Sequence, residues 1–518
     1  MPADSPRQPT GLAERDAIAR ALLRDCFNAA VAAAQPARVL AAHLPPPPVG
    51  RTVVVGAGKA AGAMAQALEA AWPVDAPLSG CVVTRDGHTP PRPAGLPTPR
   101  IEVLEAAHPV PDARSAAAGR RMLELVRGTG PDDLVIALIS GGGSALLMTP
   151  VPGLDVPALQ AMVQALLTSG LPISAMNTVR KHVSLAHGGR LALASGAPVY
   201  SLLISDVPGD APAVIASGPT VADPSTCAQA LAVLDAQGHV LPAGVRQALL
   251  RGELETPKPC DWPALRPHDR VQLIATPWQS LQAAARLARE RGWPVQVLGD
   301  ALEGEARVLG ALQADLALAV LQGRSTLAGQ ALGVAASAEW PADRPQPCLI
   351  LSGGEATVRV SRDVPRAQPA VGAAQPSVAQ PDVARPAQPD GAHAGAALRE
   401  VAPMDGARHP PLGGRAGEFC LGVIDRLQHI AAIQDADGGP LPVWALAADT
   451  DGIDGSSPSA GAVVTPDSLA RAAAVGASLS QALADHDSHG FFGQLGDLVT
   501  PGPTHTNVND FRALLVWP

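Results

Sequence analysis

Aromatic side chains, paired cysteines and an excess of positive charge are all scarce in this sequence of 518 residues. Only 3% of the residues are aromatic although 47% are hydrophobic, so a core has to be built from Ala, Leu and Val. The six cysteines are scattered without CxxC or zinc-site spacing, which is typical of a reducing compartment. The net charge of −9 gives no electrostatic reason to bind nucleic acid or an anionic membrane.

Long apolar runs are absent as well. No stretch reaches the roughly 18 consecutive apolar residues that a membrane span needs. The charged residues that precede the first apolar run do not suit a signal peptide: Asp4, Arg7, Glu14, Arg15 and Asp16. These absences predict a cytoplasmic protein without a membrane or nucleic-acid partner.

What is present is an alternation of helical and strand-like segments. After an amphipathic helix at 10–34, strands are expected at 51–56, 81–84, 134–139 and 199–205, with helices at 60–72 and 112–126. This alternation predicts an α/β protein with a parallel sheet covered on both faces.

A second folding unit is predicted after residue 260. Residues 271–300 have the pattern of a strand, a helix and a strand, and 348–360 that of two strands around a turn. The predicted domains are therefore 1–260 and 261–518. Residues 361–412 are mostly Ala, Pro, Gln, Asp and Arg, and we interpret them as a disordered insert in the second domain.

Two glycine-rich turns follow predicted strands. In VVVGAGKAAGAM, Gly56 and Gly58 precede Lys59, and the third glycine comes too late for the dinucleotide-binding fingerprint. A lysine at a helix N-terminus favours a phosphate or carboxylate, although a packed turn with an exposed lysine is the plainer alternative. In LVIALISGGGSALL, the residues Ser140 to Ser144 fit neither a P-loop nor a nucleophile elbow.

Polar residues gather after other predicted strands. Asp206 follows the strand at 199–205, at the edge where ligands bind in open α/β sheets, although a loop-capping role is equally open. In the C-terminal half, Glu355 and Arg415 each follow a glycine pair, and Asp449, Asp451 and Asp454 share one turn. That turn does not fit an EF-hand, but carboxylates of this kind suit Mg²⁺ beside a phosphorylated substrate.

A cluster of Arg180, Lys181 and His182 lies near the expected start of a helix and by itself is typical of a solvated basic face. GPTHTNVNDF supplies hydroxyl and amide groups near the end of the chain. N–H donors, cations and metal-binding carboxylates on one chain are the parts that phosphoryl transfer needs.

Seven motifs follow one another in a fixed order: GAGKAA, SGGGSALL, NTVRKH with GGRLA, SDVPGD with IASGPT, SGGEATV, ADTDGIDG and GPTHTNVND. Together they resemble the class II glycerate kinases, the glycerate 2-kinase family whose C-terminal part is called the MOFRL domain. The resemblance covers nearly the whole chain apart from its first residues and 361–412. It implies a Rossmann-like first domain with a parallel sheet and a smaller, mixed α/β second domain. The MOFRL region would span about 346–515, and the active site would lie between the domains.

The resemblance also implies an activity. It is the ATP-dependent phosphorylation of D-glycerate at its 2-hydroxyl, with Mg²⁺, to give 2-phosphoglycerate. The expected partners are D-glycerate and ATP, and a homodimer is one option for the oligomeric state. Members are often labelled hydroxypyruvate reductases, so an NAD(P)H-dependent reductase is the rival hypothesis. A binding protein with a decayed site is the third.

Site residues are carried over from the matching motifs. Lys59 would contact phosphate or substrate, Asp206 would act as base or orienting carboxylate, and Arg415 would stabilise the transferred charge. Asp451 and Asp454 would bind the metal. The remaining matches would bind substrate or ATP: Gly56, Gly58, Ser140, Gly141, Gly142, Gly143, Ser144, Arg180, Lys181, Glu355, Thr504, Asn507 and Asn509.

The sequence departs from the family pattern in three places. Arg415 is followed by Ala416 and Gly417 where the family usually has Asn and Gln, and His505 stands where it usually has Gly. The insert falls between Glu355 and Arg415. These departures put the geometry of the arginine turn in question more than the fold.

Overall fold

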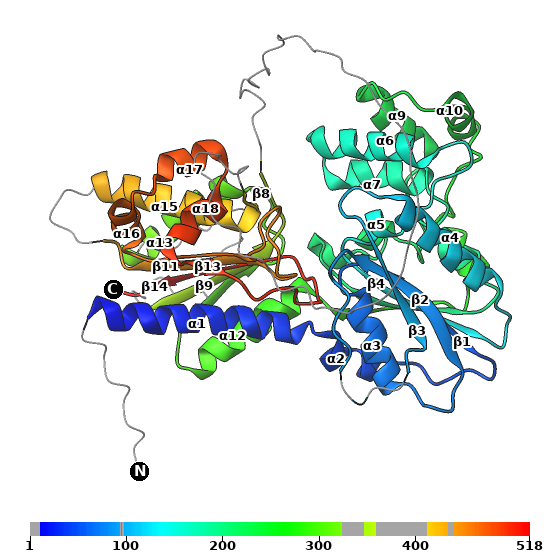
Figure 1. Ribbon diagram of the computed structural model, residues 1–518, viewed down its shortest axis with the longest axis horizontal. Coiled ribbons are helices and arrows are strands. Elements are labelled where there is room, and N and C mark those ends of the chain that lie inside the picture. The colour runs from blue at the N-terminus through cyan, green and yellow to red at the C-terminus, as the bar shows by residue number, and fades with distance from the viewer. Residues whose placement is uncertain (1–10, 94, 96–97, 324–346, 359–411, 434–439) are drawn as a thin grey trace, which may run out of the picture.

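The computed structural model describes residues 11–93, 95, 98–323, 347–358, 412–433 and 440–518 (Figure 1). Two α/β domains lie side by side in it. The predicted insert lies outside the described residues except for Leu412. No helix of the described part is long and apolar enough to cross a membrane.

Six parallel strands form the sheet of the first domain, in the order β3-β2-β1-β4-β5-β6. They are β1 (Thr52–Ala57), β2 (Leu78–Arg85), β3 (Ile101–Ala106), β4 (Leu134–Ser140), β5 (Val199–Ile204) and β6 (Arg270–Ala275). This is the strand order of the Rossmann fold, and it confirms the expected fold class. In such a sheet a crevice opens at the carboxyl ends of the strands where the order reverses, here between β1 and β4.

Both faces of the first sheet are covered by helices, because its strands are apolar on both sides. Val53 and Val55 pack in the cluster that includes α4 (Ala113–Arg127), and Val54 packs in the one that includes α3 (Ala61–Ala71). The helices α6 (Val156–Thr168), α7 (Ile173–His182), α9 (Cys227–Ala236) and α10 (Ala243–Leu250) form a separate apolar cluster beside the sheet. Shorter helices are α2 (Pro36–Val39), α5 (Gly143–Leu146), α8 (Arg190–Leu193) and α11 (Trp262–Leu265).

The second domain holds a mixed sheet with the order β13-β12-β11-β14-β9-β7. Its strands are β7 (Val295–Gly299), β9 (Cys348–Gly354), β11 (Val443–Asp449), β12 (Gly461–Val464), β13 (Leu498–Val499) and β14 (Asp510–Val516). β7 and β9 are parallel and the other neighbours are antiparallel. A parallel pair of short strands, β8 (Gly304–Glu305) and β10 (Ala356–Thr357), lies outside this sheet.

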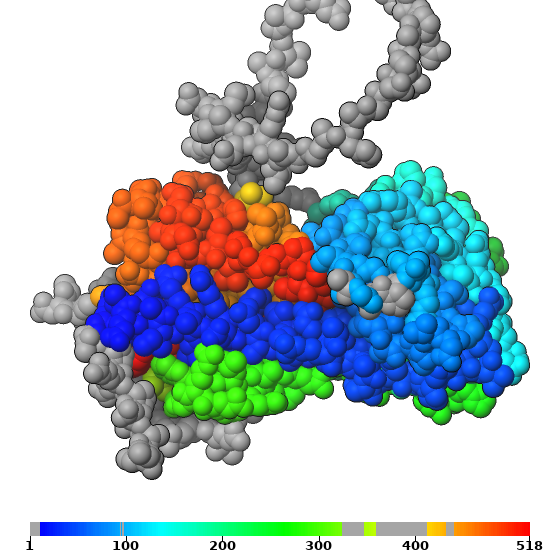
Figure 2. Space-filling model, turned by 60° about the horizontal axis from the view of Figure 1, so that its bottom comes forward, coloured from blue at the N-terminus to red at the C-terminus, as the bar shows by residue number. Residues whose placement is uncertain are grey.

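Helices also cover both faces of the second sheet. The helices α1 (Leu12–Ala33) and α12 (Pro277–Glu290) share one apolar cluster with it, and Figure 2 shows them side by side in blue and green. The opposite cluster contains α13 (Ala306–Leu321) and α15 (Arg415–Ile433). The helices α16 (Ser468–Val475), α17 (Leu479–Asp485) and α18 (Ser488–Leu495) pack around that side.

The predicted boundary at residue 260 is wrong in two ways. The helix α1 packs on the sheet of the second domain, through Leu22, Leu23 and Phe27. In the opposite direction, β6 pairs with β5 and completes the first sheet. The strand, helix and strand expected at 271–300 all form, but the two strands belong to different sheets. The second domain therefore consists of α1 and the segment that follows β6, and the first domain lies between these two parts in the sequence.

Candidate active site

The turn after β1 brings Lys59 to the point where the strand order reverses. Gly58 has a φ of +136°, and a Cβ there would lie 2.1 Å from the Ser140 hydroxyl oxygen. The backbone N–H of Lys59 donates to the Gly141 carbonyl (2.8 Å), and that of Ala60 donates to the Ser140 hydroxyl (3.0 Å). The N–H groups of Lys59, Ala60 and Ala61 are thus bonded to protein atoms. These three N–H groups are therefore not available to the anion expected at the turn of Gly56 and Gly58.

The turn after β4 makes room for side chains. A Cβ on Gly141 would lie 1.6 Å from Asp206 Oδ2 and 2.4 Å from Asn507 Nδ2. Only a glycine allows both groups to approach the backbone at this point. The glycine at position 141 of SGGGSALL therefore leaves space for the Asp206 carboxylate and the Asn507 amide.

Asp206 joins the two domains. The Asn507 side-chain amide donates to Asp206 Oδ2 (2.7 Å), and the Asn509 amide donates to the Asp206 backbone carbonyl (2.8 Å). Burial, followed by the nearby charge of Glu355, raises the pKa of Asp206 to about 7. A carboxylate with such a pKa can accept a proton near neutral pH.

Lys59 forms an ion pair with Asp451 of the second domain. The Lys59 side chain is 11% exposed and that of Asp451 is 1% exposed, so the pair is shielded from water. Although burial opposes the charged form, the carboxylates of Asp451 and Asp449 raise the pKa of Lys59. Lys59, a residue of the first domain, is therefore a charged side chain whose position is fixed by Asp451 of the second domain.

Arg415 is the first residue of α15 rather than part of a turn. Its guanidinium lies 3.0 Å from Glu355 Oε1, 2.9 Å from Asp449 Oδ2 and 3.0 Å from Asp510 Oδ1. Although burial disfavours its charge, these three carboxylates raise the pKa of Arg415 well above its ordinary value. The orientation of the Arg415 side chain is therefore fixed by three carboxylates from three separate segments of the chain.

A cavity of about 370 Å³ lies between the domains and contains groups from both. Nine of the predicted site residues line it: Lys59, Gly142, Ser144, Arg180, Asp206, Glu355, Arg415, Asn507 and Asn509. The other predicted residues are not in its lining: Gly56, Gly58, Ser140, Gly141, Gly143, Lys181, Thr504, Asp451 and Asp454. Polar lining residues that were not predicted to bind a ligand are Arg85, His108 and Asn177. Asp449 of the acidic turn also lines the cavity, although only Asp451 and Asp454 of that turn were assigned to the metal.

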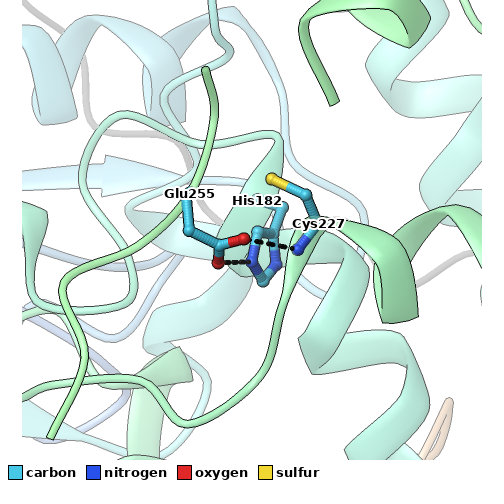
Figure 3. A group of neighbouring side chains, drawn as sticks. All are labelled: His182, Cys227 and Glu255. Carbon is cyan, nitrogen blue, oxygen red and sulfur yellow. Dashed lines mark hydrogen bonds and ion pairs between the residues drawn. The ribbon is translucent and has the colours of Figure 1, made fainter. Parts of the chain in front are cut away.

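The basic cluster ends α7 and does not start it, contrary to expectation. Lys181 donates to buried Asp223 (3.0 Å) and so is a structural cation. His182 lies 3.2 Å from Glu255 near Cys227, as Figure 3 shows. Glu255 also pairs with Lys258 and accepts from the Cys227 N–H, so this group ties α7 to α9. Arg180 alone of the cluster faces the cavity.

Asp454 and Thr504 occupy structural positions. Both oxygens of Asp454 accept backbone N–H groups at the start of α15, from Ala416 (3.0 Å) and Gly417 (2.8 Å). This capping arrangement differs from the predicted metal-binding role. The Thr504 hydroxyl donates to the Thr450 carbonyl (2.5 Å), which fixes the turn that carries Asp451.

Two departures from the family motifs, Gly417 and His505, can be related to their local structure. A Cβ on Gly417 would lie 2.3 Å from the Ser488 hydroxyl oxygen, so the packing here leaves no room for a side chain. His505 has a φ of +58°, in the left-handed region where glycine is favoured. Neither change moves Arg415 away from the cavity.

Comparisons with known proteins cover nearly the whole chain. A family model described as a domain of unknown function (DUF4147) matches residues 22–250, and the MOFRL family model matches residues 405–510. A protein of Agrobacterium vitis, provisionally named a hydroxypyruvate reductase, is 44% identical over 97% of this chain and 95% of its own. The D-glycerate 2-kinase of Thermotoga maritima is 31% identical over 92% of this chain and 93% of its own. The crystal structure of a glycerate kinase from Thermotoga maritima has a TM-score of 0.70 at 29% identity, and the match covers 96% of this chain and all of that one.

Proposed function

This chain belongs to the class II glycerate kinase family, and we propose that it transfers the γ-phosphoryl group of ATP to the 2-hydroxyl of D-glycerate. The products are 2-phospho-D-glycerate and ADP. The observation that carries this proposal is the meeting of Lys59 and Arg415, from different domains, at one cavity with Asp206.

Asp206 acts on the attacking hydroxyl. The bond from the glycerate oxygen to phosphorus forms as the bond from phosphorus to the bridging oxygen of ADP breaks. The proton of the hydroxyl passes to the Asp206 carboxylate, whose pKa of about 7 suits that exchange. Phosphoryl transfer has a loose transition state in most analyses, so little proton removal is needed early, and Asp206 also acts by orienting the hydroxyl.

Lys59 and Arg415 act on the charge of the transferred group. Their positive charges stabilise the phosphoryl oxygens most strongly when water is excluded from the cavity. Because Lys59 pairs with Asp451 across the domain boundary, the two cations face one substrate only when the domains are together. Domain closure and chemistry are thereby coupled.

The acidic residues of the second domain fit a hard divalent cation. Asp449 lines the cavity and Asp451 follows it on the same turn, where its backbone N–H donates to Asp449 Oδ1 (3.2 Å). Two such carboxylates, together with substrate phosphates, are a usual Mg²⁺ environment. We assign Asp449 and Asp451 to hold Mg²⁺, because Asp449 lines the cavity and Asp451 pairs with Lys59, which lines it as well, whereas Asp454 caps α15. When bound, Mg²⁺ would neutralise charge on the phosphate oxygens.

The geometry favours a kinase over a reductase that binds a nicotinamide dinucleotide. A dinucleotide needs free N–H groups at the start of the helix after β1 and an acid at the end of the second strand. The N–H groups of Lys59 and Ala60 are bonded to the β4 turn. The second strand, β2, ends at Arg85, and Asp86 is paired with Arg114.

Two assays on the purified protein test the proposal. D-glycerate, ATP and Mg²⁺ are expected to yield 2-phosphoglycerate, identified against 3-phosphoglycerate by chromatography. NADH oxidation with hydroxypyruvate and no ATP turnover would show a reductase instead. Inactivity in both assays would favour a binding protein with a decayed site.

A further inference from the structure

Three side chains of unlike chemistry meet beside α7 in the first domain, outside the lining of the interdomain cavity (Figure 3). One nitrogen of His182, the sulfur of Cys227 and one oxygen of Glu255 lie within 4.8 Å of one another. His182 ends α7, Cys227 begins α9 and Glu255 follows α10, so three separate segments supply them. The imidazole and the thiol are buried, whereas the Glu255 side chain is 34% exposed. A small ion can therefore reach this group from the carboxylate side.

The surroundings of the His182 ring determine which of its nitrogens can bind a ligand. Nδ1 lies 2.8 Å from the backbone carbonyl of Thr178, and a carbonyl can only accept, so Nδ1 carries the proton and donates. In the neutral ring Nε2 then has only a lone pair, and it lies 3.2 Å from Glu255 Oε1. Two acceptors at this distance repel each other unless a proton or a metal cation lies between them. Histidine ligands of metals usually have this arrangement, in which the other ring nitrogen donates to a carbonyl or carboxylate.

The separations of the three ligand atoms are close to those around a tetrahedral zinc ion. Bond lengths of about 2.0–2.3 Å from zinc to nitrogen, oxygen and sulfur place neighbouring ligand atoms about 3.3–3.6 Å apart. The nitrogen of His182 and the oxygen of Glu255 are already 3.2 Å apart, and the sulfur of Cys227 has to move by little more than about 1 Å. A thiolate and an imidazole select zinc and similar transition metals, whereas Mg²⁺ prefers oxygen ligands.

We propose that His182, Cys227 and Glu255 form a zinc-binding site, with water as the fourth ligand. The site is distinct from the carboxylates of the second domain to which Mg²⁺ is assigned, and it does not depend on the proposed function. Bound zinc would join α7 to α9 and to the segment after α10, and these three helices share one apolar cluster. Because α7 also carries Asn177 and Arg180 to the interdomain cavity, the ion would stabilise the position of that helix.

Lys258 competes with a metal ion for the same carboxylate. Its ammonium lies 2.5 Å from Glu255 Oε1, and it also donates to the Thr256 hydroxyl (2.9 Å) and to the carbonyls of Asp223 (3.3 Å) and Ser225. Lys258 therefore keeps three partners when a metal ion takes Oε1. If the site binds zinc, removing this cation strengthens the binding. If ion pairs alone hold the group together, removing it only lowers the stability of the protein.

The experiment measures binding of Zn²⁺ and Co²⁺ to the full-length, metal-free protein, with Mg²⁺ in excess to occupy carboxylate sites. Calorimetry is expected to show one tightly bound Zn²⁺ per chain, and Co²⁺ to give the near-ultraviolet charge-transfer absorption of a cobalt–thiolate bond. Cys227→Ala, His182→Gln and Glu255→Gln should each weaken Zn²⁺ binding at least about tenfold, since loss of even an outer-shell partner costs that much. Cys227→Ala should also remove the absorption, and Lys258→Met should strengthen Zn²⁺ binding several-fold.

Two other cysteines provide matched controls. Cys81 is buried in β2 and Cys260 is exposed, and neither belongs to the group. Cys81→Ala and Cys260→Ser are therefore expected to bind Zn²⁺ and to show the Co²⁺ absorption as the wild type does. Zn²⁺ should also raise the Tm of the wild type and slow hydrogen exchange in α7 and α9, but should do neither in Cys227→Ala.

Other outcomes overturn the proposal. If the wild type binds neither ion, or if the three ligand variants bind Zn²⁺ as the wild type does, this group is not a metal site. Loss of the absorption in Cys260→Ser alone would assign the ion to the exposed thiol. A lower Tm of Lys258→Met, with no Zn²⁺ binding to it or to the wild type, would show that ion pairs hold the group together. Should His182→Gln fail to fold, Cys227→Ala and Glu255→Gln decide, because the first removes only a sulfur atom and the second changes a partly exposed side chain.

Discussion

The amide of Asn507 donates to the carboxylate of Asp206 at 2.7 Å, across 301 positions of sequence. Asp206 follows β5 of the first domain, and Asn507 precedes β14 of the second. The bond forms beside Gly141, whose missing side chain leaves space for both groups. A single contact thus connects the proposed base, the glycine turn and the domain boundary.

The pH dependence of activity follows from Asp206. With its pKa raised to about 7, we expect kcat to rise as the pH passes through about 7 and this carboxylate ionises. Asp206→Asn should lower kcat by about a hundredfold or more, which corresponds to roughly 3 kcal/mol, with smaller changes in KM. Steady-state kinetics between pH 5.5 and about 8.5 check this, and an unchanged pH profile in the variant would contradict the assignment.

The stability of the protein should change with pH in the opposite direction. A raised pKa means that the folded state holds the Asp206 proton more tightly than the unfolded state does. The resulting stabilisation is fully present below the usual carboxyl pKa of about 3.9 and is lost as the pH rises through about 7. The Tm of Asp206→Asn is therefore expected to exceed that of the wild type at pH 8 by more than at pH 5. The pKa of Asp454 is also raised to about 7, mainly by burial, so Asp454→Asn is the matched variant: its Tm should change with pH in the same direction although the proposed base is kept.

Lys59 and Lys181 should separate catalysis from stability. Both are buried and paired with an aspartate, but only Lys59 lines the cavity. Lys59→Ala is expected to lower kcat by roughly a hundredfold, about 3 kcal/mol, and Arg415→Ala to have a similar effect. Lys181→Ala is expected to lower Tm because it leaves Asp223 buried without its cation, while kcat of the folded protein is kept. Near-normal kcat in both Lys59→Ala and Arg415→Ala would remove these residues from the mechanism.

Gly141→Ala tests the close approach at the second glycine turn. The added Cβ would overlap Asp206 Oδ2, at 1.6 Å, so either the carboxylate or the turn has to move. We expect a loss of activity of about a hundredfold or more, because small displacements of a reacting group are costly. Gly130→Ala is the control, since a Cβ added at Gly130 would meet no atom within 4 Å beyond its chain neighbours. Equal activities of the two variants would show that the approach has no catalytic role.

Residues 361–412 are predicted to be dispensable. Their composition of Ala, Pro, Gln, Asp and Arg offers too little apolar surface to offset the entropy of ordering them. Replacing them with a short Gly/Ser linker is expected to leave Tm and kcat nearly unchanged. A large drop in either quantity would mean that this segment contributes to the folded enzyme.

Strong local patterns made the first sheet predictable. β1 and β4 are apolar runs followed by glycine turns, and both were expected within two residues of their bounds. β3 was missed because its sequence, IEVLEA, includes two glutamates, as suits a strand at the edge of a sheet. The start of α7 was placed too late, although Pro172 immediately before it is a recognisable start signal.

The features that could not be predicted from the sequence depend on contacts between residues far apart in the chain. Nothing in the local pattern of residues 12–33 indicates which of two sheets the helix covers, and α1 covers the later one. The partner of Lys59 lies 392 positions away, and Arg415 contacts acids from three segments. Motif recognition brought most of these residues together, but their pairing required the three-dimensional structure.

The position of β14 affects how the protein can be made. This strand lies between β11 and β9 inside the second sheet, although it comes near the end of the chain. Residues 52–275 contain every strand of the first sheet, so that sheet can form while the ribosome is still working. The second sheet can be completed only after β14 has been synthesised, although its helix α1 is made first. During translation the first domain therefore matures early, and α1 spends most of that time without the surface that it later covers.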